Sequence, residues 1–237
     1  MPLNIDKQHI MKFISIDVET SGLDHESNQV LSIGAIIEDS ENPLPLEKCP
    51  KFHAAIRHDE ITGSLFAINL NRELIETIVS YQTCKNDEER KDVEESSGMR
   101  FYHKDDVVEA FYHFLYVNGM VNIDLNANMM EAAYKKDKDG NSVPVITSRI
   151  KPTHITVAGK NFATFDKQFL EKLPRWKQVI RIKQRILDPA ILYVDWKNDA
   201  SLPSLGECKE RAKIDGIVTH NALYDAWDVI ELLRKKY

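Results

Sequence analysis

The stretch Phe13-Ile14-Ser15-Ile16-Asp17-Val18-Glu19-Thr20-Ser21-Gly22-Leu23 decides how this chain folds and what it does. It begins as an apolar run rich in β-branched residues, which predicts a buried strand. Asp17 and Glu19 then stand at the carboxyl end of that strand. Residues i and i+2 of a strand point to the same face, so both carboxylates should project side by side. Such a pair is costly unless a cation compensates it, and oxygen ligands suit Mg²⁺ or Mn²⁺. The alternative is a strand end whose acids are exposed and idle.

The composition sets limits on the class of protein. The chain has 237 residues, 43% of them hydrophobic, which is enough for a sizeable core. Its 31 basic and 37 acidic residues give a net charge of −6, which argues against binding long nucleic acid by bulk charge. A bound metal ion can still reverse the field locally. Three widely spaced cysteines predict a reduced, cytoplasmic compartment and no zinc cluster, and the N-terminus predicts no signal peptide or membrane span.

The pattern of apolar residues predicts an α/β fold. Val30–Ile37 is almost entirely apolar and should be a strand in the middle of a sheet, and Phe52–Arg57 should be a third strand. Short connections between these strands predict an antiparallel start to the sheet. From Thr153 onward, strands and helices should alternate: a strand over His154–Ala158, an amphipathic helix over Phe162–Leu173, and a further strand over Arg185–Leu187.

The remaining segments are predicted from local signals. Helical spacing predicts helices over Arg72–Tyr81 and Asp105–Val117, while the charged stretch Lys85–Ser97 should be a solvated face or a mobile loop. Tyr134–Val145 should form a hairpin or surface loop. Asp188 should cap a helix that starts with Pro189 rather than bind metal, Ser204 should open a helix through a capping box, and the last helix should start near Asn221. No linker interrupts the chain, so residues 1–237 are expected to form one domain, with residues 61–150 its least legible region.

Two more segments carry acids. Asn161 precedes Asp166 by five residues at the start of a predicted helix, and His220 precedes Asp225 by five at the start of the last helix. An Asp in the first turn of a helix suits the helix dipole, and a lone His before a helix is usually a surface residue. Each segment alone therefore favours a structural role.

Taken together, the three segments resemble the DEDDh branch of the DnaQ-like 3′–5′ exonucleases. The resemblance lies in Ile16–Leu23, in Asn161–Leu170 and in His220–Ala226, in that order, and Val30–Ala35 is also similar to the family's second strand. The spacing of Asn161 and Asp166 is closest to oligoribonuclease-type members. The resemblance implies a ribonuclease H-like fold, with a central mixed β-sheet flanked by helices, and it covers both ends of the chain but not its middle.

The same resemblance implies a two-metal mechanism. Asp17 would bridge two divalent ions, Mg²⁺ or Mn²⁺, Glu19 and Asp225 would complete the site of one ion, and Asp166 would serve the other. Two such ions stabilise the charge of an in-line displacement and acidify the attacking water. His220 would act as general base, because histidine exchanges its proton near neutral pH. The products would be a 5′-mononucleotide and a strand shortened at its 3′ end.

Contacts to the substrate are expected from residues beside these acids. Thr20, Ser21 and Leu23 follow the first strand and would meet the terminal nucleotide, and Asn161 and Phe162 precede Asp166, with Phe162 either stacking on a base or belonging to the core. The expected partner is a single-stranded nucleic acid or oligonucleotide, without a membrane; a homodimer and a polymerase or replication partner are both compatible with the resemblance. The alternatives are a catalytically silent nucleic-acid-binding or proofreading-accessory module and an endonuclease on the same fold.

Overall fold

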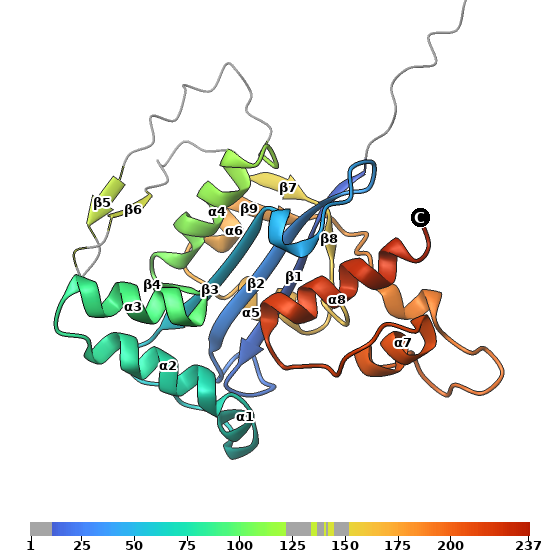
Figure 1. The fold of residues 1–237 in the computed structure, drawn as a ribbon, viewed down its shortest axis with the longest axis horizontal. Coiled ribbons are helices and arrows are strands. Elements are labelled where there is room, and N and C mark those ends of the chain that lie inside the picture. The colour runs from blue at the N-terminus through green and yellow to red at the C-terminus, as the bar shows by residue number, and fades with distance from the viewer. Residues whose placement is uncertain (1–10, 122–133, 137–139, 141, 145–151) are drawn as a thin grey trace, which may run out of the picture.

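A mixed five-stranded sheet forms the centre of the molecule in the computed structural model (Figure 1). The structure describes residues 11–121, 134–136, 140, 142–144 and 152–237. The strand order is β4-β3-β2-β1-β8. The strands are β1 (Lys12–Thr20), β2 (Val30–Asp39), β3 (Lys51–Arg57), β4 (Arg100–His103) and β8 (Val157–Ala158). Strands β1, β2 and β3 pair antiparallel, as predicted, whereas β4 pairs parallel with β3 and β8 parallel with β1. The carboxyl ends of β1, β3, β4 and β8 therefore lie at the same edge of the sheet.

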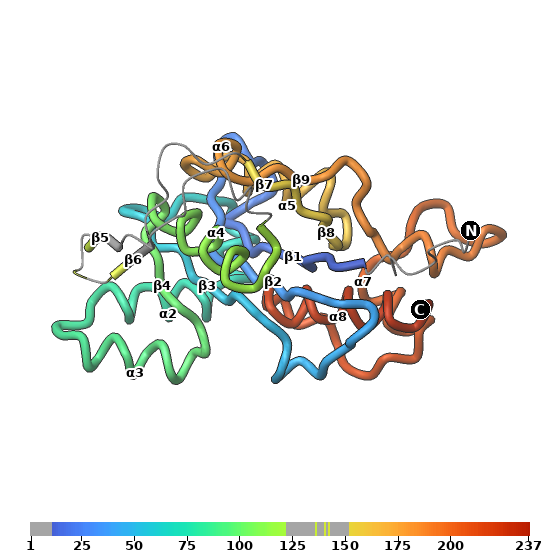
Figure 2. The backbone as a smooth tube through the Cα atoms, turned by 90° about the horizontal axis from the view of Figure 1, so that it is seen from above, coloured from blue at the N-terminus to red at the C-terminus, as the bar shows by residue number. Residues whose placement is uncertain are grey.

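Helices cover both faces of this sheet (Figure 2). One face packs against α4 (Val107–Val117), α5 (Asp166–Leu170) and α6 (Trp176–Val179) through the apolar side chains of β1, β2 and β3. On the other face, α8 (Ala222–Arg234) covers β1 and β2, while α2 (Arg72–Thr83) and α3 (Asp87–Ser97) cover β3 and β4. This α/β arrangement confirms the predicted fold class.

Short elements complete the described chain. They are η1 (Leu46–Lys48), α1 (Leu65–Leu70), η2 (Pro189–Leu192), α7 (Leu205–Ala212), the antiparallel pair β5 (Tyr134–Lys136) and β6 (Ser142–Pro144), and the parallel pair β7 (Thr153–Ile155) and β9 (Ile180–Ile182). The pairing of β5 with β6 agrees with the predicted hairpin, although most of its turn lies outside the described residues. Among the described helices, none has both the length and the apolar character needed to cross a membrane.

The predicted capping signals are confirmed. The Asp188 side chain accepts the N–H of Ala190 at the start of η2, and Ser204 and Glu207 form a reciprocal capping box at the start of α7. Helix α8 starts with Ala222, directly after Asn221, whose side chain accepts the first free backbone N–H groups. Its side chains Ala226, Val229, Ile230 and Leu233 are buried against the sheet.

One prediction of secondary structure was right in part and three were wrong. The charged stretch that was expected to be a solvated face or a loop forms a helix, α3, which Asn86 caps. The helix buries no side chain, so the expected solvated face was right and the expected loop was wrong. The expected strand over 154–158 divides into β7 and β8, which join different sheets. Arg185–Leu187 makes only an isolated bridge through Leu187. The helix expected over Phe162–Leu173 is limited to α5, because residues 160–165 form turns that begin with Asn161 at a φ of 57°.

Candidate active site

The carboxylates of the opening strand meet those of the last helix at the carboxyl end of β1. Asp17 and Glu19 lie on the face of β1 that α8 covers, and the first turn of α8 carries Asp225 to the same point. One ligand oxygen from each of these three residues lies within 4.8 Å of the others. Glu19 and Asp225 are only 8% and 6% exposed. The structure thus brings together acids that are about two hundred residues apart in the sequence.

A glycine lets α8 approach the sheet this closely. Gly34 lies opposite Asp17 in β2, and a Cβ atom there would come within 2.1 Å of the backbone carbon of Ala222. Real Cβ atoms never come that near to a main-chain atom, so a larger residue would push the first turn of α8 away from the sheet. Asn221 fixes where this turn begins, since its Oδ1 accepts the N–H groups of Leu223 and Tyr224.

The fourth acid, Asp166, approaches β1 from the side of the strand that pairs with β8. It is the first residue of α5 and is 3% exposed. Its Oδ1 accepts the N–H of Val18 at 3.0 Å, beyond the point where β8 stops pairing with β1. This bond holds one carboxylate oxygen against the strand. The sequence prediction that all four acids gather around one point agrees with this placement, while their roles as ligands stay predictions.

Burial raises the pKa of every carboxyl group in this cluster, and the charges of neighbouring acids add to it for Asp17 and Glu19. The pKa of Asp17 is well above its usual range because of burial and of the nearby charges of Asp166, Glu19 and Asp225. Burial, followed by the charges of Asp225 and Asp166, raises the pKa of Glu19 to about 8. Burial raises the pKa of Asp166 to about 7 and that of Asp225 to about 6. Four ionised carboxylates are therefore unfavourable here without a compensating cation.

The donor set fits a hard divalent cation. All of the ligand atoms are carboxylate oxygens, which Mg²⁺ and Mn²⁺ prefer. Asp225 Oδ1 is buried and has no hydrogen-bond partner within the described part of the chain. A buried, unsatisfied carboxylate oxygen costs free energy, and coordination to a metal ion removes that cost.

The raised pKa of Glu19 predicts how the stability of the metal-free protein depends on pH. Between about pH 4.5 and about pH 8, the folded state keeps a proton that the unfolded state has lost, so the free energy of unfolding falls as the pH rises. Glu19→Gln cannot ionise, so in EDTA we expect it to exceed the wild type in stability at about pH 8.5 and to match it near pH 4. Urea unfolding of both proteins at each pH measures this difference. The buried His53, whose pKa falls to about 4, titrates in both proteins and cancels. A difference that does not vary with pH would contradict the expectation.

His220 lies in the exposed loop between α7 and α8. Its backbone has a φ of 51°, in the left-handed region, and its side chain is exposed beside the carboxylates, close enough for its charge to act on Asp225. Against the larger effect of burial, the nearby backbone N–H of Thr219 lowers the pKa of Asp225. The structure thus places an exposed imidazole next to the carboxylates, while its role as a base stays a prediction.

A buried ion pair anchors this loop. Lys209 Nζ on α7 donates to Asp228 Oδ2 on α8 at 2.6 Å, and both residues are at most 7% exposed. The carbonyl oxygen of Lys209 also accepts the N–H of Ile214, where the loop begins. Its Nζ lies beside Gly216, since a methyl group on that glycine would be 3.8 Å from it. Lys209 therefore joins the start of the His220 loop to the helix that carries Asp225.

Removing this lysine should destabilise the protein. Lys209→Met leaves Asp228 buried without its cation, which typically costs about 3–5 kcal/mol. The double variant Lys209→Met/Asp228→Leu removes both charges and should recover most of that loss, because an apolar pair of similar volume replaces the ion pair. Urea unfolding at about pH 7 measures both. If the single variant unfolds at the same urea concentration as the wild type, the ion pair does not hold the two helices together.

The predicted substrate residues after β1 build a loop rather than offer free polar groups. Thr20 Oγ1 donates to the carbonyl of Gly22 at 2.8 Å. Ser21 Oγ donates to the carbonyl of Thr62 at 2.6 Å and accepts the N–H of Gln29, while its own N–H donates to the Gln29 carbonyl. Both side chains are buried. Leu23 differs from them, since it is 85% exposed at the tip of the turn. Contact with a nucleotide, through backbone amides or apolar packing, stays a prediction for all three.

Of the two predicted contacts before Asp166, one is corrected. Phe162 is fully buried in the core that α4, α5 and α6 form with the sheet, so its ring has no free face on which a base can stack. Its place there fixes the turn that presents Asp166. Asn161 is exposed, and its N–H donates to Asp188 Oδ2 at 2.9 Å, which gives Asp188 a second structural task. A contact between the Asn161 side chain and substrate stays a prediction.

Two residues beside the site were missed from the sequence. Leu65 and Phe66 begin helix α1 and are 90% and 78% exposed. The N–H of Ser64, the N-cap of α1, donates to the carbonyl of Ser21 at 2.9 Å, so this helix is attached to the loop that follows β1. The sequence does contain a signal for this helix and its exposed residues: two large apolar residues directly follow the capping residue Ser64. The signal was missed because this region matched no motif.

The comparisons with known proteins bear on the fold. No protein-family model and no curated protein match this sequence. The structure is similar to that of E. coli Exonuclease I in complex with a 5cy-dT13 oligonucleotide, with a TM-score of 0.50 and 14% sequence identity. The match covers 94% of this chain and 39% of that chain, so the present chain spans well under half of the length of its structural neighbour. This likeness supports the α/β exonuclease-type fold that the motifs predict.

Proposed function

We propose that this protein is a metal-dependent 3′–5′ exonuclease that degrades single-stranded DNA, RNA or short oligonucleotides to 5′-mononucleotides. The observation that carries the proposal is the convergence of Asp17, Glu19 and Asp225 within 4.8 Å, with the buried Asp166 beside them. Buried carboxylates in this number are unfavourable unless they hold cations. The likeness of the fold to a nuclease crystallised with an oligonucleotide supports the same assignment.

Asp17, Glu19, Asp166 and Asp225 would hold two divalent ions, Mg²⁺ or Mn²⁺. When bound, such ions acidify a water molecule and stabilise the negative charge that develops on the phosphate and on the leaving oxygen. The tie between Asp166 and the backbone of β1 leaves its second oxygen for a ligand role. The cap at Asn221 and the contact at Gly34 keep Asp225 at a fixed depth.

His220 would take the proton from the attacking water. Its loop is anchored at one end by Lys209 and Ile214 and at the other by the cap of α8. Between these anchors residues 215–217, 219 and 220 are exposed, so the imidazole can move toward a bound substrate. A general base must come within hydrogen-bonding distance of the proton that it removes, which is often reached only in the complex.

Apolar side chains around the site would hold the terminal nucleotide. Leu23 follows β1, and Leu65 and Phe66 lie on the helix attached to that same loop. An aromatic ring stacks on any base, which suits an enzyme that removes nucleotides one after another without regard to sequence.

The direction of attack gives the test. A single-stranded oligonucleotide with a 3′ phosphate or an inverted 3′ nucleotide should resist degradation, whereas the same block at the 5′ end should have no effect. DNA and RNA substrates labelled at the end opposite the block, with Mg²⁺ or Mn²⁺ present, show the products on a denaturing gel.

The other candidate functions give different products in the same assay. Cleavage of a circular single strand would assign the protein as an endonuclease. Binding without degradation of any substrate would favour a catalytically silent module. Full activity in EDTA would contradict the use of metal ions.

A further inference from the structure

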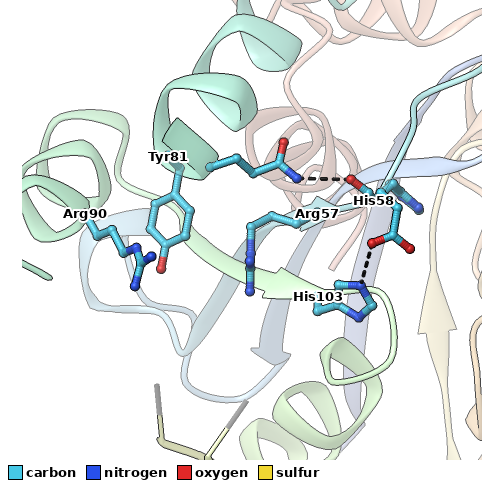
Figure 3. Close-up of a pocket in the computed structure, with 7 residues that line it drawn as sticks. Arg57, His58, Tyr81, Arg90 and His103 are labelled. Carbon is cyan, nitrogen blue, oxygen red and sulfur yellow. Dashed lines mark hydrogen bonds and ion pairs between the residues drawn. The ribbon is translucent and has the colours of Figure 1, made fainter. Parts of the chain in front are cut away.

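A second polar site lies at the carboxyl ends of β3 and β4 (Figure 3). It is a pocket of about 230 Å³ whose lining comes from β3, β4, α2, α3 and the turn after β3. The lining residues are Arg57, His58, Asp59, Tyr81, Gln82, Arg90 and His103. Two arginines and two histidines face one carboxylate, so the lining is rich in groups that donate hydrogen bonds to anions.

This pocket opens at the same edge of the sheet as the four carboxylates. β1, β3 and β4 all run in the same direction, so their carboxyl ends are level. Glu19 is opposite Ser32, which is opposite Ala55, and Arg57 is two residues further along β3 on that same face. From Glu19 to Arg57 the path crosses two strand spacings and then runs two residues along β3. The backbones of these two residues are therefore on the order of 12 Å apart. One nucleotide chain can therefore approach both sites.

Arg57 is held by aromatic packing, and Arg90 by a bond from its Nη1 to Asp87 Oδ1 at 3.3 Å. Figure 3 shows Arg57 and Arg90 on either side of Tyr81, and the Arg57 guanidinium lies 5.5 Å from the centre of the Tyr81 ring. Tyr81 in turn stacks on Phe101, with ring centres 4.1 Å apart. A guanidinium group has five N–H donors, so an arginine that already binds a protein group keeps donors for a phosphate.

The two histidines each present a buried ring nitrogen to the pocket. His103 Nδ1 lies 3.2 Å from Asp105 Oδ2 and 3.3 Å from the Asp105 backbone nitrogen, and its buried Nε2 has no hydrogen-bond partner within the described part of the chain. His58 Nε2 contacts the carbonyl of Val30 at 2.7 Å, so it carries the proton, and its buried Nδ1 is an acceptor without a partner in that same part. Both rings thus keep one nitrogen for a ligand, and that of His58 is an acceptor.

Asp59 is the acid in the lining, and its side chain leaves room for an anion. Its carboxylate is 74% exposed and lies 3.6 Å from Lys104 Nζ, a further cation at the rim. Its distance of 3.9 Å from His103 Nε2 is too long for a hydrogen bond. The carboxylate is open to solvent and does not bond to His103 Nε2, so a phosphate can bind at this nitrogen beside Asp59.

We propose that this pocket binds a backbone phosphate and the attached sugar of the nucleic-acid substrate, upstream of the nucleotide held at the carboxylates. The proposal rests on the proposed function, because it gives the same substrate a second point of contact. The arginines and His103 Nε2 contact the phosphate oxygens, and His58 Nδ1 accepts the 2′ hydroxyl when the sugar is a ribose. The pocket would thereby favour oligonucleotides long enough to span both sites.

Variants of Arg90 test whether this pocket binds the nucleic-acid substrate. Binding is measured in an Asp17→Asn background, which holds substrate without cutting it, so that binding is assessed even if the wild type cleaves nothing. Arg90→Gln should bind an octanucleotide roughly 10-fold to 100-fold more weakly, as expected for lost charge-assisted bonds, while a dinucleotide is unaffected. Arg90→Lys keeps the charge without the planar fork and should give an intermediate loss. Arg72→Gln, an exposed arginine outside the lining, is the matched control.

Neutral linkages then locate the contact. Each phosphate of the octanucleotide is replaced in turn by a methylphosphonate, and one position should weaken binding when Arg90 is present but not in Arg90→Gln. Equal losses for the dinucleotide and the octanucleotide, or a cycle with no coupling at any linkage, would overturn the proposal. Calorimetric binding of inorganic phosphate that is lost in Arg90→Gln, without coupling to any linkage, would reassign the pocket to a free anion. Absence of cleavage by the wild type would instead refute the proposed function.

Discussion

Asp17→Asn should lower the rate of phosphodiester cleavage by about three to five orders of magnitude. Asp17 lies at the centre of the cluster, where the charges of Glu19, Asp166 and Asp225 all act on it. Stabilisation of charge in a metal-assisted displacement is worth several kcal/mol, and each 1.36 kcal/mol is about tenfold in rate. The amide keeps the size of the side chain and removes its charge, so the loss reflects metal binding and not packing.

The variant should remain folded, and this separates catalysis from stability. In EDTA, removal of one carboxylate relieves repulsion, so Asp17→Asn should melt at or above the temperature of the wild type at about pH 8. Single-turnover rates and thermal melts are measured side by side. Asp39→Asn, which changes an acid at the opposite end of the same strand pair, is the control and should cut at the normal rate. Normal cleavage by Asp17→Asn would remove the basis of the metal mechanism.

His220→Ala should lower the turnover rate by roughly two to four orders of magnitude, the usual worth of a positioned general base. Affinity for Mn²⁺ should change little, because the four carboxylates remain and a hard oxygen site needs no imidazole. Asp225→Asn should weaken Mn²⁺ binding directly. The two variants therefore differ in which quantity falls, although their residues are neighbours.

Calorimetry with Mn²⁺ and rates at saturating metal distinguish the two roles. Exposure of His220 predicts that truncating it costs little stability, so a loss of activity is not a folding defect. Loss of Mn²⁺ affinity as severe as in Asp225→Asn, or an unchanged turnover rate, would show that His220 is not the base.

Periodicity predicted the parts of the fold that depend on neighbours in sequence. The i, i+2 rule placed Asp17 and Glu19 on one face, and the continuous apolar run placed β2 inside the sheet. Capping signals predicted the starts of η2, α7 and α8, because a cap bonds to groups only two or three residues away. The convergence of Asp166 and Asp225 on β1 required the family resemblance, since no local rule links residues so far apart.

Where prediction failed, long-range packing decided the outcome. The apolar periodicity of residues 162–173 is real, but Phe162 is drawn into the core and Asn161 adopts a left-handed turn, so the helix starts only at Asp166. The pocket around Arg57 and Arg90 brings together residues from two strands and two helices. No spacing in the sequence relates these residues, and only the parallel pairing of β3 with β4 places their ends together.

The contact between Gly34 and the backbone of Ala222 sets how closely α8 can approach β2. Main-chain atoms have no rotamers, so the separation between β2 and α8 is set by atomic radii and cannot drift as side chains change. Core residues elsewhere under α8 can exchange volume with one another without altering the depth of Asp225. The size of the carboxylate site therefore does not depend on most of the sequence, whereas position 34 has room for no side chain.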